Sequence, residues 1–197
     1  MGLTAKWACV NVGAGSPEGY GYWFSWGEGA EYVTTKDTFW WESYKLGGGT
    51  NNSPKITKYN VQTEYGTVDN RTSLLSTDDV ATVLDADSRM PTASEAQDLI
   101  DRCVWAFTTY KGVNGYLVKS NVNGARIFLP AAGYYSSSSS GSKSNDFLGS
   151  AAYYWTSDLY SEDCLYAKTL DYYGTYYHEV SKLYRSHGAS VRPVSKY

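Results

Sequence analysis

The chain has 197 residues and a formal net charge of -3, which is enough for one domain with a full core. This charge balance disfavours nucleic acid as the main partner, because phosphate binding needs a clustered basic surface. No block of like charges indicates a polybasic membrane patch. No apolar stretch reaches the roughly 18 residues that span a bilayer, so direct membrane insertion is not expected.

Three cysteines, Cys9, Cys103 and Cys164, are present, and no pair has C-x-x-C spacing. An odd number without that spacing gives little support to a disulfide framework or a structural zinc site. Buried thiols are the favoured interpretation, and a Cys9–Cys103 bridge stays open.

The first 75 residues are rich in glycine, tryptophan and tyrosine. Residues 1–13 hold one lysine and no long apolar run, so they lack the pattern of a signal peptide. They predict instead the first strand of a folded domain. Residues 19–29 predict a strand or extended loop. Residues 46–55, LGGGTNNSPK, predict a loop, because glycine, asparagine and proline favour turns.

Two helices are predicted next. Residues 76–84 begin at Ser76, with Asp79 three positions on, and put Val80, Val83 and Leu84 on one face. Residues 91–103 hold a T-x-x-E capping box. An apolar stripe follows at the spacing of a helix face, and it consists of Ala96, Leu99, Ile100 and Cys103.

A hairpin is predicted around Asn123-Gly124, a pair that suits a type I′ turn and is flanked by apolar residues 116–118 and 127–129. From Gly133 onward, apolar residues are sparse and regularly spaced, as in short strands with one buried face. The expected fold class is α+β: two helices packed on a small, irregular, mostly antiparallel sheet with long loops, in one domain over residues 1–197.

Motifs for catalysis or cofactor binding are weak. Residues 13–19, GAGSPEG, have proline where a phosphate-binding helix would start, and there is no Walker motif or G-x-S-x-G elbow. His178 and His187 lie in an irregular, serine-rich part of the chain, which does not favour a Ser-His-Asp site. The acidic group at 158–163 lacks an EF-hand loop. We therefore expect no enzyme activity, metal or cofactor.

Tyrosine is the unusual residue: there are 20, and most follow Leu129, where serine is also concentrated, including a run at 136–140. Tyrosine gives a large, stiff, amphipathic contact surface at low entropic cost, and antibody loops use the same mixture with serine. A tyrosine-rich sheet face that packs on its own domain is the alternative. Adjacent side chains on a strand point to opposite faces, so we expect at least one exposed ring in each adjacent pair, at 134–135, 153–154, 172–173 and 176–177.

The codons of this region add a genetic argument. Changing one or both adenines of an asparagine codon yields tyrosine, serine, aspartate, histidine, glycine, cysteine or threonine, and these residues dominate the last third of the chain. Mutagenesis directed at adenines would leave this composition.

An ordered set of motifs resembles the bacterial "major paralogous domain" family over about residues 3–194. These motifs include GLTAKWACVNVGA, YGYWFSWGE, RMPTASEAQDLIDRCVW, NGARIFLPAAG, YYWTSDLY and SVRPV. The resemblance implies a C-type-lectin-like fold, shared with the variable proteins of diversity-generating retroelements and with formylglycine-generating enzymes. The sequence has WTS where the family has WSS. It lacks the calcium-lectin triplets and the paired active cysteines of the enzymes.

The resemblance also implies a division of roles. Trp155, Arg185, Gly188 and residues 190–194 would be scaffold, residues 1–132 would be constant, and residues 133–197 would hold the variable binding region. The implied ligand-binding positions are Tyr153, Asp158, Tyr160, Asp163, Tyr172, Tyr173, Tyr176, His178, Tyr184, Ser186 and His187.

The expected function is therefore ligand binding by a hypervariable, receptor-like or adhesin-like protein of phage or bacterial origin. The partner would be a protein or glycan on a cell or virion surface. The protein would be extracellular or displayed on such a surface, exported as part of a longer chain. A fixed adhesion or glycan-binding domain without diversification stays open, and so, with less support, does an enzyme of the formylglycine-generating type.

Overall fold

The computed structural model describes residues 2–29, 36, 38–137 and 143–195. Strands account for 41% of the structure and helices for 11%, and within the described residues the strands form five small sheets. The expected α+β class, with two helices packed on one small sheet, is therefore wrong. The chain forms a many-stranded, sandwich-like β fold, because short runs pair locally as hairpins while only two short segments of the described residues form α-helices.

The central sheet is an antiparallel meander of β10 (Ala151–Leu159), β11 (Tyr166–Tyr173) and β12 (Tyr177–Tyr184). Its side chains alternate between two hydrophobic clusters. Tyr154 and Leu170 belong to one cluster, while Trp155 and Ala167 belong to the other. Both faces of the middle of this sheet are thus covered, and surface positions arise mainly at the ends of its strands.

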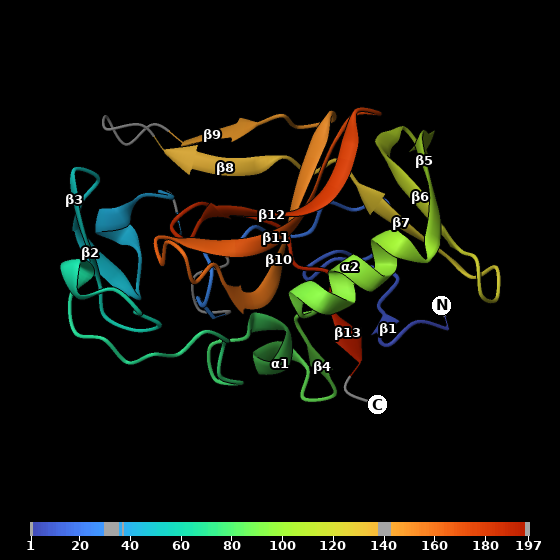
Figure 1. Ribbon diagram of the computed structural model, residues 1–197. Helices are drawn as coiled ribbons and strands as arrows, with labels where there is room; N and C mark the ends of the chain where they lie inside the picture. The colour runs from blue at the N-terminus through green and yellow to red at the C-terminus, as the bar shows by residue number, and fades with distance from the viewer. Residues whose placement is uncertain (1, 30–35, 37, 138–142, 196–197) are drawn as a thin grey trace.

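One face of the central sheet packs against α2 (Ala93–Asp101) and the sheet of β5 (Cys103–Tyr110), β6 (Val113–Ser120) and β7 (Arg126–Pro130). The other face packs on the amino-terminal aromatic segments, including Trp26 and Trp41. Figure 1 shows the β5–β7 sheet at one end of the molecule and the hairpin of β2 (Gly47–Thr50) and β3 (Ser53–Ile56) at the other.

The helices confirm one prediction and correct another. In α2, the Thr92 side chain accepts from the Glu95 amide, Glu95 in turn accepts from the Thr92 amide, and Ala96 and Leu99 are fully buried. The helix ends at Asp101, so Cys103 belongs to β5. The first helix, α1 (Val80–Leu84), begins after Asp79, not Ser76, because the Asp79 carboxylate accepts from two helix amides. Val83 and Leu84 are exposed, so only Val80 of the expected face is buried.

The predicted hairpin forms between β6 and β7, but its turn differs from a type I′ turn. Gly124 alone in this loop has positive φ (+73°), and the Ser120 amide donates to the Ala125 carbonyl across a four-residue loop. Residues 46–55 are not an irregular loop, since β2 and β3 pair there in register. Residues 19–29 contain one isolated bridge, between Phe24 and Ala189.

The remaining short elements tie the two ends of the chain together and frame the central sheet. Strand β13 (Val194–Ser195) pairs with both β1 (Lys6–Trp7) and β4 (Ser88–Arg89). Strands β8 (Tyr134–Ser137) and β9 (Lys143–Asp146) form a separate hairpin. Two 3-10 turns, η2 (Trp41–Ser43) and η3 (Thr63–Tyr65), lie in the amino-terminal half. The serine run extends into residues 138–140, which lie outside the described residues.

Two buried arginines hold distant segments together. The Arg185 guanidinium donates to the Lys58, Tyr59 and Cys164 carbonyl oxygens and to the Tyr44 hydroxyl, at 2.9–3.0 Å. Arg192 donates to the Asn11 side chain at 2.8 Å and to the Ala8 and Phe128 carbonyls. These positions, together with the fully buried Trp155, have the packing that a scaffold requires.

All three cysteines are free thiols. Cys9 is exposed, whereas Cys103 and Cys164 are buried, so the structure contains no Cys9–Cys103 bridge. In the part of the chain that the structure describes, no helix is both long enough and apolar enough to cross a membrane.

Candidate functional site

A continuous set of aromatic rings runs along the central sheet, from the β11–β12 turn to the far end of β12, and we call it the aromatic surface. Its rings follow one another at centroid distances of 4.9–6.4 Å. Its members come from β8, β10, β11, β12 and the loops between strands. They are Tyr134, Phe147, Tyr153, Tyr173, Tyr176, Tyr177, Tyr184 and His187.

Strand register and two close backbone contacts place these rings together. Tyr173 and Tyr177 are paired at the end of β11 and β12, and the turn between them contains Gly174 with φ +48°. Tyr135 and Gly188 exchange backbone hydrogen bonds of 2.7 and 2.8 Å. This bridge brings Tyr134 beside His187, and the two rings stack at 5.4 Å. The surface is therefore assembled from segments far apart in the sequence.

The aromatic surface is only partly covered by the rest of the chain. Tyr176 is 81% exposed, the largest exposed fraction among the large hydrophobic side chains described, and Phe147, Tyr177 and Tyr184 are also exposed. Tyr153 and His187 are half-buried and form its floor. The exposed rings are held by stacking on their neighbours, so the surface is partly ordered before any ligand arrives.

Carboxylates lie against the floor of the aromatic surface. Asp171 on β11 is paired with Tyr153 on β10 and with Glu179 on β12. Its side chain is buried, at 3% exposure, and its Oδ1 atom has no hydrogen-bond partner among the described residues. Burial raises the pKa of Asp171 well above its ordinary value, the Thr169 and Ser181 side chains oppose this shift, and the nearby Glu179 charge adds to it. A buried carboxyl oxygen without a hydrogen-bond partner is costly, so the Oδ1 atom requires a physical explanation.

His187 occupies a second position of interest, because it also lines a pocket of about 120 Å³. Its Nδ1 atom is buried without a hydrogen-bond partner among the described residues. Burial lowers the pKa of His187 to about 4, with a smaller opposite effect from Asp146, so the ring is neutral at pH 7. The other lining residues are Trp40, Trp41, Asn51, Pro54, Leu165, Tyr184 and Ser186.

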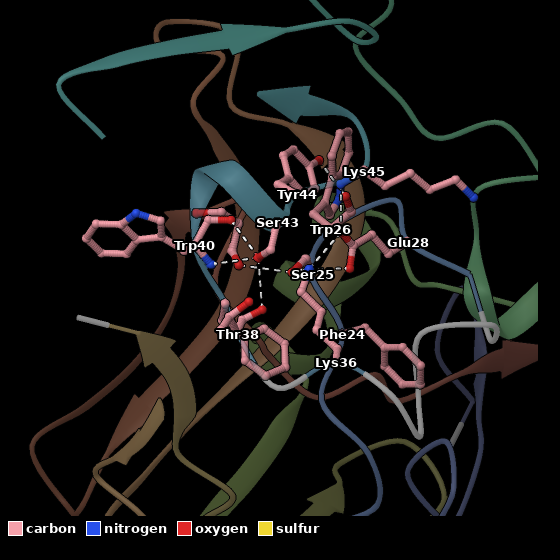
Figure 2. A network of polar contacts seen from close by, with 12 residues as sticks. Phe24, Ser25, Trp26, Glu28, Lys36, Thr38, Trp40, Ser43, Tyr44 and Lys45 are labelled. Carbon is pink, nitrogen blue, oxygen red and sulfur yellow. Dashed lines mark hydrogen bonds and ion pairs between the residues drawn. The ribbon is translucent and has the colours of Figure 1, made fainter. Parts of the chain in front are cut away.

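A polar network supports the wall of this pocket (Figure 2). The Lys36 ammonium contacts both Glu28 carboxylate oxygens at 2.6–2.7 Å and the Ser25 hydroxyl at 2.7 Å. The Ser25 hydroxyl donates to the Ser186 carbonyl at 2.9 Å. Both members of the Lys36–Glu28 pair are buried, and burial lowers the pKa of Lys36 despite the attraction of Glu28. The network thus fixes the segment that carries Ser186 and His187.

The same network fixes the segment that carries the pocket tryptophans. The Lys45 amide donates to Glu28, and the Ser43 hydroxyl donates to the Thr38 carbonyl at 3.0 Å. The Trp40 indole points away from these contacts in Figure 2. A buried ion pair and a set of backbone hydrogen bonds therefore position an aromatic wall opposite His187.

The predicted binding residues fall into two groups. Five of them lie on the aromatic surface: Tyr153, Tyr173, Tyr176, Tyr184 and His187. A sixth, Ser186, is only 2% exposed and lines the same pocket as Tyr184 and His187. The others lie elsewhere, and Tyr172 is the clear correction. It is fully buried, and its hydroxyl donates to the Leu129 carbonyl at 2.7 Å, because its side chain points from β11 toward the cluster that includes α2.

The remaining predicted residues have local structural contacts. Asp158 accepts from the Ala93 amide at 2.6 Å, near the start of α2. His178 stacks on Trp105 at 4.7 Å, on the face of the sheet opposite Asp171. Tyr160 donates to Glu162, and Asp163 accepts from the Leu165 amide. These contacts account for the four side chains without a ligand.

Several members of the site are absent from the predicted binding positions. Tyr134 and Tyr177 belong to the adjacent tyrosine pairs at 134–135 and 176–177, which were expected to expose a ring. Phe147, Asp171 and Trp40 carry no signal of their own, because their role depends on which strands the fold brings together.

The described residues contain no group of three histidine, cysteine, aspartate or glutamate residues placed to hold a metal ion. The Cys164 thiol is buried and donates to the Asn60 side chain at 3.2 Å, and burial raises its pKa. A thiol with a raised pKa is a poor nucleophile.

Comparison with known proteins gives one match. A family model described as a domain of unknown function, DUF8237, matches residues 105–194. This range runs from within β5 to the start of β13 and includes every residue of the aromatic surface. No curated protein matches the chain, and no solved structure matches it.

Proposed function

We propose that the protein is a recognition protein, not an enzyme, and that the aromatic surface is its ligand-binding face. The observation that carries this proposal is the continuous contact of the rings from Tyr176 to Tyr184, with Tyr176 81% exposed at one end. Folding alone gives no reason to expose so many stacked rings, because an exposed ring gains little from burial.

The chemistry of tyrosine supports a binding role. A tyrosine ring offers large contact area with two side-chain torsions to immobilise, and its hydroxyl supplies a hydrogen bond. Binding energy in protein interfaces concentrates in such aromatic anchors. Stacking between Tyr173 and Tyr176, at 5.7 Å, restricts these rings before binding and so lowers the entropic cost.

The resemblance to major paralogous domain proteins and to retroelement variable proteins supports a more specific form of this proposal. Tyr153, Tyr173, Tyr176, Tyr184 and His187 would be diversified positions encoded by adenine-containing codons. Trp155, Arg185 and Arg192, all fully buried, would be the fixed scaffold. The ligand would be a protein or glycan on a cell or virion surface, and the protein would act outside the cell or on such a surface.

Binding to intact cells tests this proposal. Fluorescently labelled protein is incubated with a panel of bacterial cells and phage particles, and the Tyr176→Ala and Tyr177→Ala variants are compared with Tyr110→Ala. Tyr110 and Tyr177 are each 41% exposed, but Tyr110 lies on β5, outside the aromatic surface, so it is a matched control. We expect binding to fall in the first two variants and to persist in the control. Equal binding by all three would contradict the proposal.

A fixed glycan-binding function is the second candidate, and the pocket beside His187 is the observation that favours it. Trp40, Trp41 and Tyr184 provide apolar ring faces, while Asn51 and His187 provide polar groups, in a volume of about 120 Å³. Aromatic faces with a few polar groups are a common form of small-ligand site. A glycan array with the wild type and a Trp40→Ala variant separates the candidates, since pocket-dependent binding to one glycan class would favour this alternative.

A further inference from the structure

Lysine and arginine side chains lie over aromatic rings in many parts of the chain. The closest of these contacts are Lys182 over Tyr160 at 4.0 Å and Lys143 over Tyr135 at 4.4 Å, measured from the ammonium to the ring centroid. Others involve Lys36, Lys58, Lys111 and Arg185. The chain thus supplies its own cations to rings in several of its regions.

The largest part of the aromatic surface has no such cation. Within the described ranges, no lysine or arginine lies over any of six rings, which are Tyr134, Phe147, Tyr153, Tyr173, Tyr176 and Tyr177. The π faces of these rings carry partial negative charge, and those at the edge of the surface are open to solvent.

Carboxylates surround these same rings. Asp171 is in register with Tyr153 and with the exposed Glu179, and it is close enough to Tyr177 for its charge to raise the pKa of that phenol. Asp146 lies next to Tyr134. Burial is the main cause that raises the pKa values of Tyr153, Tyr177 and Tyr134. The next cause is a carboxylate charge, from Asp171 for Tyr153 and Tyr177 and from Asp146 for Tyr134. The patch therefore combines open π faces with negative charge, and among the described residues no lysine or arginine lies over its rings.

Asp171 supplies an independent observation. It is 3% exposed and its Oδ1 atom lacks a hydrogen-bond partner among the described residues. Its neighbours are Thr169 and Ser181, Glu179, and the phenols of Tyr153 and Tyr177. None of these is a cation. A carboxylate in such a position gains most from a positively charged donor that comes from outside the chain.

We propose that these six rings and Asp171 form a cation-binding site that receives a lysine or arginine side chain from a protein partner. The inference rests on the proposed function and names the chemistry of its ligand. The cation lies over the rings near Tyr173, Tyr176 and Tyr177 and is attracted by the Glu179 charge. Its approach also favours the ionised form of Asp171, whose pKa is raised in the free protein. Tyr177 stands at the first position of β12 and is 41% exposed, so part of its ring is accessible to a partner.

Charge complementarity selects this occupant. An anionic ligand would meet Asp171, Glu179 and Asp146, and like charges at close range are strongly unfavourable in an interface. A neutral apolar ligand would leave the Asp171 oxygen unpaired. A lysine or arginine side chain fits both the rings and the carboxylates. Its apolar stem covers ring area, while its head group interacts with the π faces and the carboxylates.

A titration with a matched pair of small probes tests the inference. Protein with isotope-labelled tyrosine rings is titrated, with NMR detection, with N-acetyl-lysinamide and with its Nε-acetylated form, which has the same stem without the charge. We expect the charged probe to bind about fivefold more tightly, the ratio that corresponds to ~1 kcal/mol. The shifts should concentrate on Tyr173, Tyr176 and Tyr177, and the affinity should fall as salt is added.

Variants provide the controls. Tyr176→Ala and Asp171→Asn should each weaken the charged probe several-fold and leave the neutral probe unchanged, whereas Tyr110→Ala should affect neither. Equal binding of the two probes, or no shift with either, would overturn the inference. Choline binding more tightly than the lysine and arginine amides would also overturn it, in favour of a small quaternary ammonium ligand. If the cation effect is absent but Tyr176→Ala still abolishes cell binding, the recognition function stands and only its cationic chemistry fails.

Discussion

Tyr172 and Tyr173 are neighbours in the chain and have opposite environments. The Tyr172 ring is fully buried, at 4.8 Å from the Tyr116 ring, and its hydroxyl donates to the Leu129 carbonyl. The Tyr173 ring lies on the aromatic surface between Phe147 and Tyr176. Strand alternation assigns one ring to the core and one to the surface, so a single strand serves both the scaffold and the binding face.

Alanine substitutions should separate these two roles. Tyr172→Ala removes a buried ring and should reduce the free energy of unfolding by ~3–5 kcal/mol, as for other buried aromatic residues. Tyr176→Ala removes an exposed ring and should change it by no more than ~0.5 kcal/mol. Urea unfolding of both variants measures the difference. A large loss of stability in Tyr176→Ala would show that the exposed rings belong to the folding core.

Arg185 should be essential for folding although its charge has no ion pair in the described structure. Its guanidinium donates to three backbone carbonyls and the Tyr44 hydroxyl, and lies 4.9 Å from the Trp26 ring. Arg185→Gln leaves several of these buried acceptors unpaired and should cost at least ~3 kcal/mol. Arg185→Lys should also destabilise, because an ammonium cannot reproduce the planar fork of donors. A wild-type melting temperature in either variant would refute this role.

Asp171→Asn should increase stability at high pH. Burial raises the pKa of Asp171 in the folded state above its unfolded value, so the folded protein holds this proton more tightly. The stability contributed by Asp171 is therefore complete below an unfolded pKa of about 4 and falls as pH rises toward the folded pKa. The asparagine variant avoids this loss and should gain ~1–2 kcal/mol at pH 8 and little at pH 4.

Urea unfolding of wild type and Asp171→Asn at the two pH values gives the comparison. A gain confined to pH 8 would fit a residue retained for binding at the expense of stability. Destabilisation by the same amount at both pH values would mean that Asp171 makes a structural hydrogen bond that outweighs the cost of its burial.

His187 should make the protein sensitive to acid. Burial lowers its pKa from 6.5 to about 4, so the folded protein releases this proton more readily than the unfolded chain. The contribution of His187 is therefore complete above pH 6.5 and is lost as pH falls toward 4, by up to ~3 kcal/mol. A His187→Phe variant keeps the stacking with Tyr134 and should lack this part of the acid dependence. Parallel stability profiles for the two proteins would exclude the effect.

The features that could be predicted from the sequence are those that depend on local chemistry. Thr92 and Glu95 specify the start of α2 by a capping box, and apolar residues around Asn123 and Gly124 specify the β6–β7 hairpin. The hairpin at 47–56 was missed because three glycines suggest a loop, although the β2 backbone pairs with β3 at each position. The high strand content of the fold results from many short strand pairings, and no local sequence pattern predicts these pairings.

The candidate site shows the same limit. The expectation of an exposed ring in each adjacent tyrosine pair holds only for the pair at 176–177, where both rings are exposed; in the pairs at 134–135, 153–154 and 172–173 no ring is more than half-exposed. Nothing in the sequence indicates which ring of a pair faces the core, because both faces of the central sheet are covered. Tyr172 and Tyr173 are chemically identical, and only the packing of α2 and β5–β7 on one face distinguishes them. The role of Asp171 could not be predicted, because it depends on the strand register that places Asp171 beside Tyr153 and Glu179.

Sequencing of the gene itself tests most directly whether the aromatic surface is a diversified recognition face. Codons 153–187 are sequenced deeply in a clonal population and in close relatives. Substitutions should concentrate at adenines in the codons of Tyr153, Tyr173, Tyr176, Tyr184 and His187, while the codons of the buried Trp155, Tyr172 and Arg185 stay fixed. An invariant region, or substitutions spread equally over exposed and buried codons, would contradict diversification of this surface.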